Sequence, residues 1–346
     1  MHCHAAGIGA GNSGCFVSAQ MRDSFKFRLY LRSFGVTEAE VQAAGDGLIL
    51  QRLSAKLAQS RYVKRAVVLA IDGVVDERTG EMDRARTEFY VPNEFLAAEV
   101  PKYKNLLWGA SVNPLRKDAL ARLAWAKAHG AVLVKWLPPI QGFDPADPRL
   151  VPFYDKLVEL HLPLLVHTGP ENSFTKASDE LGDPSRLELA AKCGVTVIAA
   201  HAGCGEVWLG SNDASDDLAR LMRKYPNVYA DISALALVTR GRALQRVLQN
   251  PAFTGRLLYG SDYPLIEMTV LESACEFPFS ISPWNARRIM KEPNAWDRDV
   301  LLKQQLGVPR DVWTRWETLV AEPEAESRAH KADRGGGPEN GRGDRI

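Results

Sequence analysis

Long apolar runs, a dense set of cysteines and an excess of one charge are all missing from this sequence of 346 residues. No apolar stretch approaches the roughly 18 residues that span a bilayer, and the start lacks the basic and apolar regions of a signal peptide. The five cysteines are odd in number and scattered, which favours free thiols over the even disulfide sets of small secreted domains. These absences indicate a cytoplasmic protein that does not engage a membrane.

The charges are nearly balanced, with 43 Lys and Arg against 42 Asp and Glu and a formal net charge of +1. Binding to nucleic acid or to an anionic membrane surface usually requires a concentration of positive charge, and the body of the chain has no long basic run. We therefore expect a small-molecule substrate and no nucleic-acid partner. The balance leaves open whether identical chains assemble into an oligomer.

Short apolar runs alternate with segments of helical periodicity along the body of the chain, which is typical of βαβ units and a parallel sheet buried on both faces. The length suits one (β/α)₈ barrel, or TIM barrel, over residues 1–321, with a C-terminal helical extension. Residues 322–346 are too polar to bury a core and are expected to form a disordered tail. Seven strands are expected at Ala66–Ile71, Leu106–Val112, Val132–Lys135, Leu164–His167, Val195–His201, Val228–Ile232 and Leu257–Asp262.

Four of these runs end in a residue that can bind or position a metal: Lys135, His167, His201 and Asp262. The first three are 32 and 34 residues apart, and Asp262 follows 61 residues later. These spacings correspond to one, one and two units of a barrel of about 250 residues divided into eight. Because the C-terminal ends of barrel strands surround one mouth, the four side chains are expected to converge there.

His2 and His4 are expected to complete this cluster, because residues two apart on a strand project to the same face. Three imidazoles and a carboxylate suit Zn²⁺, or Fe²⁺, Co²⁺ or Mn²⁺, with a position left open for water. We therefore expect His2, His4, His167 and Asp262 to bind one divalent metal, most readily Zn²⁺. Only Met1 precedes His2, so the first strand is expected to be poorly paired here and to have an apolar segment upstream in the native protein.

The motifs HCH, LLVHTGPE, IAAHAGCG and LLYGSDYP together resemble the amidohydrolase superfamily, from residue 1 to about residue 264. The resemblance is to the amidohydrolase-related branch, which also contains decarboxylases of the aminocarboxymuconate-semialdehyde type. It implies His-x-His on the first strand, histidines ending the fifth and sixth, and an Asp ending the eighth. A lysine ending the fourth strand is carboxylated in some superfamily members, so Lys135 leaves a second, bridged metal as the less favoured alternative.

The expected chemistry is hydrolysis of an amide, lactone or related carbon centre, since a divalent metal lowers the pKa of a bound water toward 7. Asp262 is expected to orient that water and take its proton, and His201 to polarise the carbonyl. Nonoxidative decarboxylation of an unsaturated or aromatic acid is the alternative, and a catalytically silent metal-binding barrel is an alternative of another class. Four residues that flank the ligands are expected to bind substrate: Lys135, Trp136, Glu171 and Tyr263.

Three further features have alternative interpretations. Lys135 faces outward instead if a bulge alters the strand end. Gly9–Gly14 matches GxGxxG, but no apolar strand precedes it, so a flexible loop over the metal is favoured over a dinucleotide site. Residues 72–90 form a long polar insert that is a candidate cover for the active site.

Overall fold

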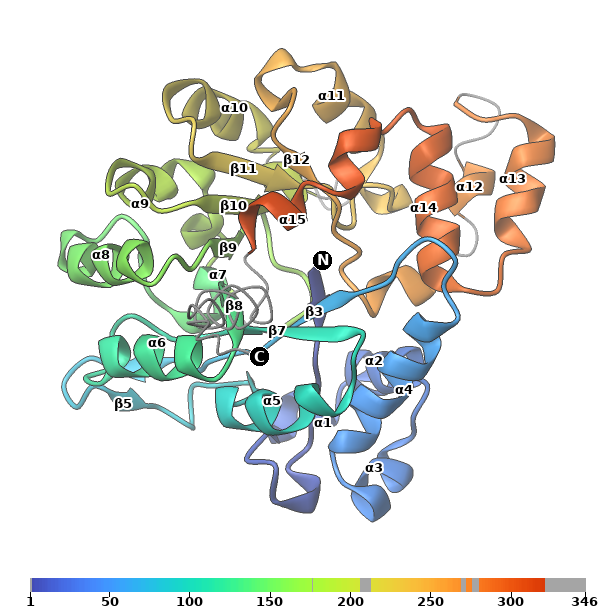
Figure 1. Ribbon diagram of the computed structural model, residues 1–346. Helices are drawn as coiled ribbons and strands as arrows, with labels where there is room; N and C mark the ends of the chain where they lie inside the picture. The colour runs from blue at the N-terminus through green and yellow to red at the C-terminus, as the bar shows by residue number, and fades with distance from the viewer. Residues whose placement is uncertain (1, 176, 206–212, 269–271, 276–279, 321–346) are drawn as a thin grey trace, which may run out of the picture.

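The computed structural model describes residues 2–175, 177–205, 213–268, 272–275 and 280–320, and its centre is a parallel barrel of eight strands (Figure 1). The predicted fold is confirmed, and the disordered tail predicted for 322–346 lies outside the described residues. The barrel strands, in their order around the sheet, are β1 (His2–His4), β3 (Ala66–Leu69), β7 (Leu106–Ala110), β8 (Ala131–Trp136), β9 (Leu164–His167), β10 (Val197–Ala200), β11 (Val228–Asp231) and β12 (Leu257–Leu258).

Strand β1 has only three residues, yet it is hydrogen-bonded on both sides. On one side it pairs in parallel with β3, with His2 opposite Val67. On the other side, the His4 amide donates to the Tyr263 carbonyl at 2.8 Å, and the Asp262 amide donates to the His2 carbonyl at 3.0 Å. The expectation of a poorly paired seam is therefore wrong, because the residues that follow β12 supply the missing partner.

Helices surround the strands and cover their outer faces (Figure 1). A capping box begins α3, in which the Thr37 hydroxyl and the Glu40 carboxylate satisfy each other's backbone amides. The α-helices are α1 (Ala19–Arg22), α2 (Phe25–Phe34), α3 (Glu38–Ala44), α4 (Gly47–Ala58), α5 (Asn93–Glu99), α6 (Ala119–Ala128), α7 (Pro138–Gln141), α8 (Val151–Glu159), α9 (Glu188–Lys192), α10 (Ser215–Lys224), α11 (Ala243–Gln249), α12 (Glu272–Cys275), α13 (Pro283–Met290), α14 (Ala295–Gln305) and α15 (Trp316–Leu319).

The strands separate two apolar clusters because successive residues of a strand point to opposite faces. Leu165 and Ile198 belong to the cluster inside the barrel, which Trp316 of α15 also joins. Val166 and Ala199, one position further along the same strands, pack in the larger cluster between the strands and the helices. This alternation decides which strand-end residues can reach the mouth of the barrel.

Several predicted strands end earlier than expected, and two of these matter for the site: β10 ends at Ala200 and β12 at Leu258. The chain then turns, and both His201 and Asp262 adopt left-handed backbone conformations, with φ of 60° and 58°. Such conformations are unfavourable for residues other than glycine and concentrate at functional sites. The two side chains are thus presented by tight turns that follow the strands rather than by the strands themselves.

Backbone pairing holds the 72–90 insert, and side-chain hydrogen bonds hold the start of the glycine-rich loop. The insert contains the hairpin β4 (Val75–Asp76) and β5 (Glu81–Met82), and its β6 (Phe89–Tyr90) pairs with β2 (Phe16–Val17). In the glycine-rich loop, the Asp46 carboxylate accepts hydrogen bonds from the amides of Ile8 and Gly9 at 2.9 Å each. A carboxylate of the protein thus occupies the donors that a nucleotide phosphate would need in a dinucleotide site.

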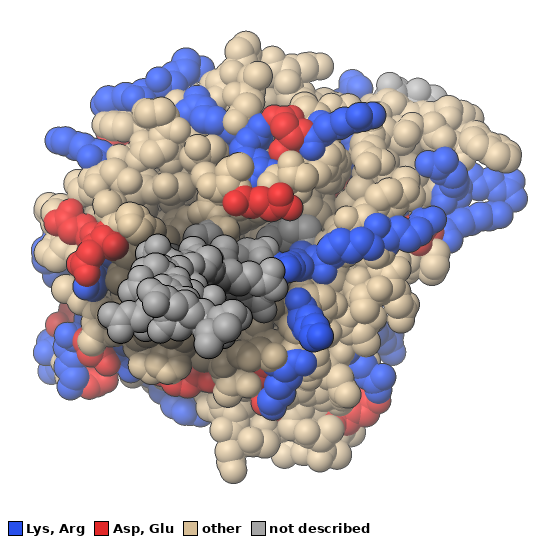
Figure 2. Space-filling view, viewed as in Figure 1, with Lys and Arg blue, Asp and Glu red and all other residues tan. Residues whose placement is uncertain are grey.

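The distribution of charge on the surface agrees with the nearly balanced charge of the sequence. Figure 2 shows basic and acidic side chains spread around one face rather than gathered in a single patch of one sign. All five cysteines are free, as predicted. Within the ranges that the structure describes, no helix is both long enough and apolar enough to cross a bilayer.

Candidate metal centre

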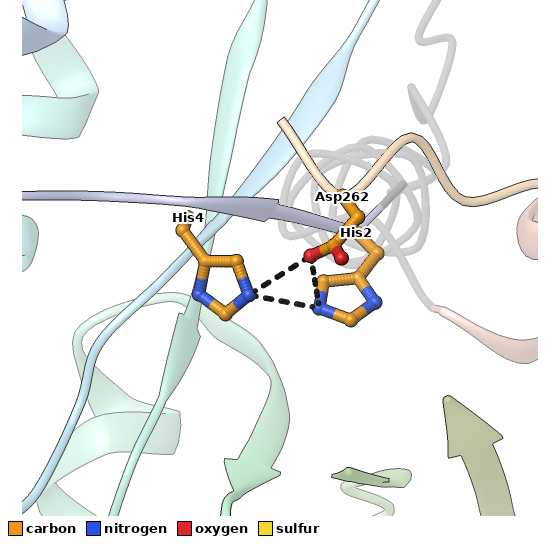
Figure 3. Close-up of side chains that lie close together, drawn as sticks. All are labelled: His2, His4 and Asp262. Atoms are coloured by element: carbon orange, nitrogen blue, oxygen red, sulfur yellow. Dashed lines mark hydrogen bonds and ion pairs between the residues drawn. The ribbon is translucent and has the colours of Figure 1, made fainter. Parts of the chain in front are cut away.

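Three predicted ligands meet at the mouth of the barrel, where His2 and His4 of β1 face Asp262 (Figure 3). The two Nε2 atoms are 3.2 Å apart. Asp262 Oδ1 lies 3.1 Å from His4 Nε2 and 3.6 Å from His2 Nε2. His2 and Asp262 are buried, and His4 is partly exposed. The three atoms form a triangle that is open toward the pocket.

The size of this triangle fits a single ion. Ligand atoms 2.0–2.2 Å from one metal, at tetrahedral to octahedral angles, are separated by about 2.8–3.6 Å. The three measured separations fall in that range. The donor set of imidazole nitrogens and a carboxylate oxygen suits Zn²⁺ and similar divalent metals.

Asp231, at the end of β11, fixes the protonation of His2. Its Oδ2 accepts a hydrogen bond from His2 Nδ1 at 2.9 Å, and a carboxylate can only accept. Burial, with a smaller contribution from Lys135, lowers the pKa of His2 to about 4 although Asp231 opposes the shift, so the ring is neutral at pH 7. The proton therefore sits on Nδ1, and Nε2 presents its lone pair to the triangle. The sequence predicted the strand Val228–Ile232 but not a role for Asp231. Its position one residue before the predicted end of that strand could have placed it among the site residues.

Replacing Asp231 with asparagine is expected to weaken metal affinity by about 10- to 100-fold. An amide facing His2 Nδ1 can donate to it, which moves the ring proton to Nε2 and blocks the ligand lone pair. Titration of apoprotein with Zn²⁺ against a competing chelator measures the change. Ser233→Ala, which leaves Asp231 intact, serves as a milder comparison. Equal affinity in Asp231→Asn and the wild type contradicts the assigned role.

His167, at the end of β9, lies outside the triangle but lines the same pocket. Its Nε2 is buried without a hydrogen-bond partner, and its Nδ1 lies 3.4 Å from a carboxylate oxygen of Glu171. Burial lowers the pKa of His167, which favours the neutral ring, although Glu171 opposes the shift. An unpaired buried nitrogen is costly in a native structure. A bound metal would supply the missing partner.

His201 is also part of this cluster, with its ring centroid 5.0 Å from that of His167 and 5.4 Å from that of His2. The Ser233 hydroxyl donates its hydrogen to Asp231, so His201 Nδ1 must donate to Ser233 oxygens, at 2.9 and 3.0 Å. Burial, reinforced by Arg240, holds the pKa of His201 well below its usual range. The neutral ring therefore carries a lone pair at Nε2.

Besides Asp231, the charged groups Asp262 and Lys135 lie close to His2. Burial alone would raise the pKa of Asp262, but its electrostatic interactions with His201 and His2 and its hydrogen bond with His4 outweigh burial and hold the pKa well below the usual range. Lys135 is fully buried and points into the barrel, with its Nζ 3.2 Å from His2 Nε2, so the outward-facing alternative is wrong. Burial lowers the pKa of Lys135 to about 8, against the opposing effect of nearby carboxylates.

The predictions that Trp136 and Tyr263 bind substrate need correction. Because Lys135 points inward, the next residue points outward, and the Trp136 ring packs between Phe143 and Phe153 behind the barrel wall. Tyr263 follows the inward-facing Asp262 and stacks on Trp296 in the same outer layer. Neither residue lines the pocket, whereas Glu171 does.

The pocket above the triangle is largely apolar, and its lining was only partly foreseen. Phe89 is the contribution of the 72–90 insert. A larger contribution comes from α1 and α2, which sequence reasoning did not assign to the site. The spacing of Phe27, Leu31 and Phe34 was the available signal, since it places them on one face of a helix. The lining residues from α1 and α2 are Met21, Phe27, Tyr30, Leu31 and Phe34.

A sequence model of the amidohydrolase family matches residues 44–287, which is more than half of the chain. The chain belongs to the amidohydrolase family. The resemblance noted from the sequence motifs is thereby confirmed. The matched segment includes His167, His201 and Asp262 but begins after His2 and His4, so the triangle joins residues inside and outside the family match.

No curated protein matches this amidohydrolase sequence. Solved structures with a similar fold include an uncharacterized TIM-barrel protein from Bordetella bronchiseptica, with 17% identity and a TM-score of 0.49 over 81% of this chain and 90% of that chain. A putative 2-pyrone-4,6-dicarboxylic acid hydrolase from Pseudomonas putida has 14% identity and a TM-score of 0.49 over 80% and 86%. A 5-carboxyvanillate decarboxylase from Sphingomonas paucimobilis has 13% identity and a TM-score of 0.49 over 95% and 97%.

Proposed function

We propose that this amidohydrolase is a metal-dependent hydrolase that cleaves an amide, lactone or related carbon centre of a small molecule. His2, His4, His167 and Asp262 would hold one divalent ion, most readily Zn²⁺. The triangle of two imidazole nitrogens and a carboxylate oxygen at ligand spacing, at the base of an apolar pocket, carries the proposal. Family membership supports it independently.

When bound, the ion would supply Lewis acidity that polarises the substrate carbonyl and lowers the pKa of a water. Asp262 is suited to orient that water and accept its proton, because its carboxylate is ionised and its Oδ1 is one corner of the triangle. The left-handed turn at Asp262 and the hydrogen bond from its amide to the His2 carbonyl hold the carboxylate in that position. Asp262 can then return the proton to the leaving group.

His201 was expected to polarise the carbonyl, and its tautomer limits how it can do so. A neutral ring whose Nδ1 donates to Ser233 has no hydrogen at Nε2 to give to a carbonyl oxygen. His201 must first accept a proton there. We therefore propose that the proton the water gives to Asp262 passes to His201 before it reaches the leaving group, so that Nε2 donates to the carbonyl oxygen in the meantime. The Asp262 carboxylate lies 4.0 Å from His201 Nδ1.

Replacing His201 with glutamine is expected to lower kcat by about 10²- to 10⁴-fold, the usual contribution of a proton-transfer group, while one metal equivalent stays bound. Elemental analysis and steady-state kinetics on the same preparation measure the two effects. Replacing the exposed His129 with glutamine is the matched control. Loss of the metal together with the activity would instead identify His201 as a ligand.

Lys135 bears on the number of metals. A protonated amine 3.2 Å from a ligand nitrogen opposes a divalent ion, and the lowered pKa of Lys135 eases loss of that proton. Carboxylation would go further, because it turns the amine into an anionic oxygen ligand that could bridge a second metal. We keep the proposal of a single metal, since the described residues form one cluster of three ligand groups and no second cluster beside it.

Nonoxidative decarboxylation of an unsaturated or aromatic acid is the second candidate. The apolar lining favours it, because a carboxylate is poorly solvated in such a pocket and is replaced by hydrogen once neutral carbon dioxide leaves and the remaining carbanion takes up a proton. The deciding experiment incubates metal-loaded protein with panels of lactones, acyl amides and aromatic acids and records ring opening, amine release and carbon dioxide. Activity that chelator removes and metal restores supports an enzyme. Metal binding without turnover of any panel supports a catalytically silent barrel.

A further inference from the structure

Arg240 is the one Lys or Arg among the described residues that line the pocket. It ends the short 3₁₀ turn Val238–Arg240, which follows β11, so it enters the pocket from the C-terminal side of the barrel, as the metal centre does. Only 6% of the residue is exposed. Burying a permanent positive charge is costly unless it gains a partner, so its surroundings indicate its role.

Among the residues that the structure describes, none forms an ion pair that neutralises Arg240. Its Nη1 donates to the Cys204 carbonyl at 2.9 Å, which orients the guanidinium without offsetting its charge. Its Nε is buried and has no hydrogen-bond partner. A buried, oriented and incompletely paired guanidinium in a ligand pocket is a site for an anion.

The rest of the pocket defines what kind of anion fits. Phe27, Phe89 and Phe174 contribute aromatic walls. Its two described acids are Asp262, in the metal centre, and Glu171, which accepts a hydrogen bond from the Ser173 amide at 2.7 Å. One guanidinium beside apolar walls is complementary to a ligand that carries one negative charge and is otherwise apolar. A phosphate dianion would carry one more negative charge than a single guanidinium can balance in an apolar pocket.

We propose that Arg240 binds a carboxylate of the substrate other than the group that reacts, and that the substrate class is an aromatic or similarly apolar molecule bearing that carboxylate. The identity of the reacting group rests on the proposed function. Arginine can present two parallel N–H groups to the two oxygens of a carboxylate. The apolar walls exclude water and strengthen the pair, so Arg240 sets both the orientation and the selectivity of binding.

The test compares 3-phenylpropanoate with its neutral amide by isothermal titration calorimetry, on metal-loaded and metal-stripped protein. The acid is expected to bind at least about tenfold more tightly than the amide in both forms, the typical gain from a charge-assisted hydrogen bond. Arg240→Gln should abolish this preference, and Arg240→Lys should keep part of it. Arg242→Gln, at an exposed arginine two residues away, should match the wild type.

Several results would overturn the proposal. These are no preference for the acid, a preference that survives in correctly folded Arg240→Gln, or a preference that vanishes when the metal is removed, which would place the carboxylate on the metal. The proposed function fails separately: a preference lost in Arg240→Gln without turnover of any lactone, amide or acid leaves the carboxylate site standing. Turnover of carboxylated substrates with an unchanged KM in Arg240→Gln leaves the hydrolase standing and removes this site.

Discussion

Asp262→Asn is expected to lower turnover by at least about a thousandfold, because the substitution removes both a ligand oxygen charge and the proposed proton acceptor. Asparagine is the informative replacement. Asp262 has φ of 58°, and asparagine tolerates the left-handed region far better than alanine, so the turn and its bond to β1 should persist. The loss can then be attributed to the carboxylate rather than to an altered backbone. Steady-state kinetics at saturating metal measures it.

The matched control for Asp262→Asn is Glu159→Gln, an exposed acid at the end of α8 whose loss should leave kinetics unchanged. Metal content is measured on every preparation. If Asp262→Asn retains turnover within tenfold of the wild type, the residue neither takes a proton nor holds a metal that the reaction needs. Retained metal with lost turnover would separate the two roles and leave proton transfer as the essential one.

Residue spacing predicted the convergence at the barrel mouth because βα units have a nearly constant length. Lys135 and His167 end neighbouring strands, and in the folded chain Lys135 pairs with Leu165 of β9 in parallel register. The alternation of inward and outward residues along a strand could also be predicted from the sequence. It correctly placed His2 and His4 on one face, and their Nε2 atoms lie 3.2 Å apart. It was not applied to Trp136, which was therefore predicted on the wrong face of its strand.

The parts of the site that escaped prediction depend on tertiary contacts that no periodicity encodes. Asp231 was part of a predicted strand, but its bond to His2 joins residues 229 positions apart. The position of α2 over the pocket also escaped prediction, since its apolar face could equally have packed on the outer wall of the barrel. The turns at His201 and Asp262 were predicted as strand because an apolar run precedes each of them, whereas the left-handed backbone is imposed by the surrounding structure.

His167→Ala is expected to lower metal affinity at least tenfold and to abolish turnover. The reason is its unpartnered Nε2, which a ligand role explains and a purely structural role does not. For the wild type, metal at 100 times Kd should stabilise the folded state by about 2.7 kcal/mol, if the unfolded chain does not bind it. Thermal melts of the variant with and without metal should show a smaller rise in Tm at the same metal concentration.

His161→Ala, at a histidine exposed after α8, controls for nonspecific loss of an imidazole and should keep the full metal-dependent rise in Tm. The metal-free proteins also need comparison, because alanine at position 167 leaves a cavity that lowers stability by itself. Only the difference between metal-loaded and metal-free melts reports on ligation. If His167→Ala binds one metal equivalent with unchanged affinity, the ion is held by His2, His4 and Asp262 without it, and the buried Nε2 serves the substrate instead.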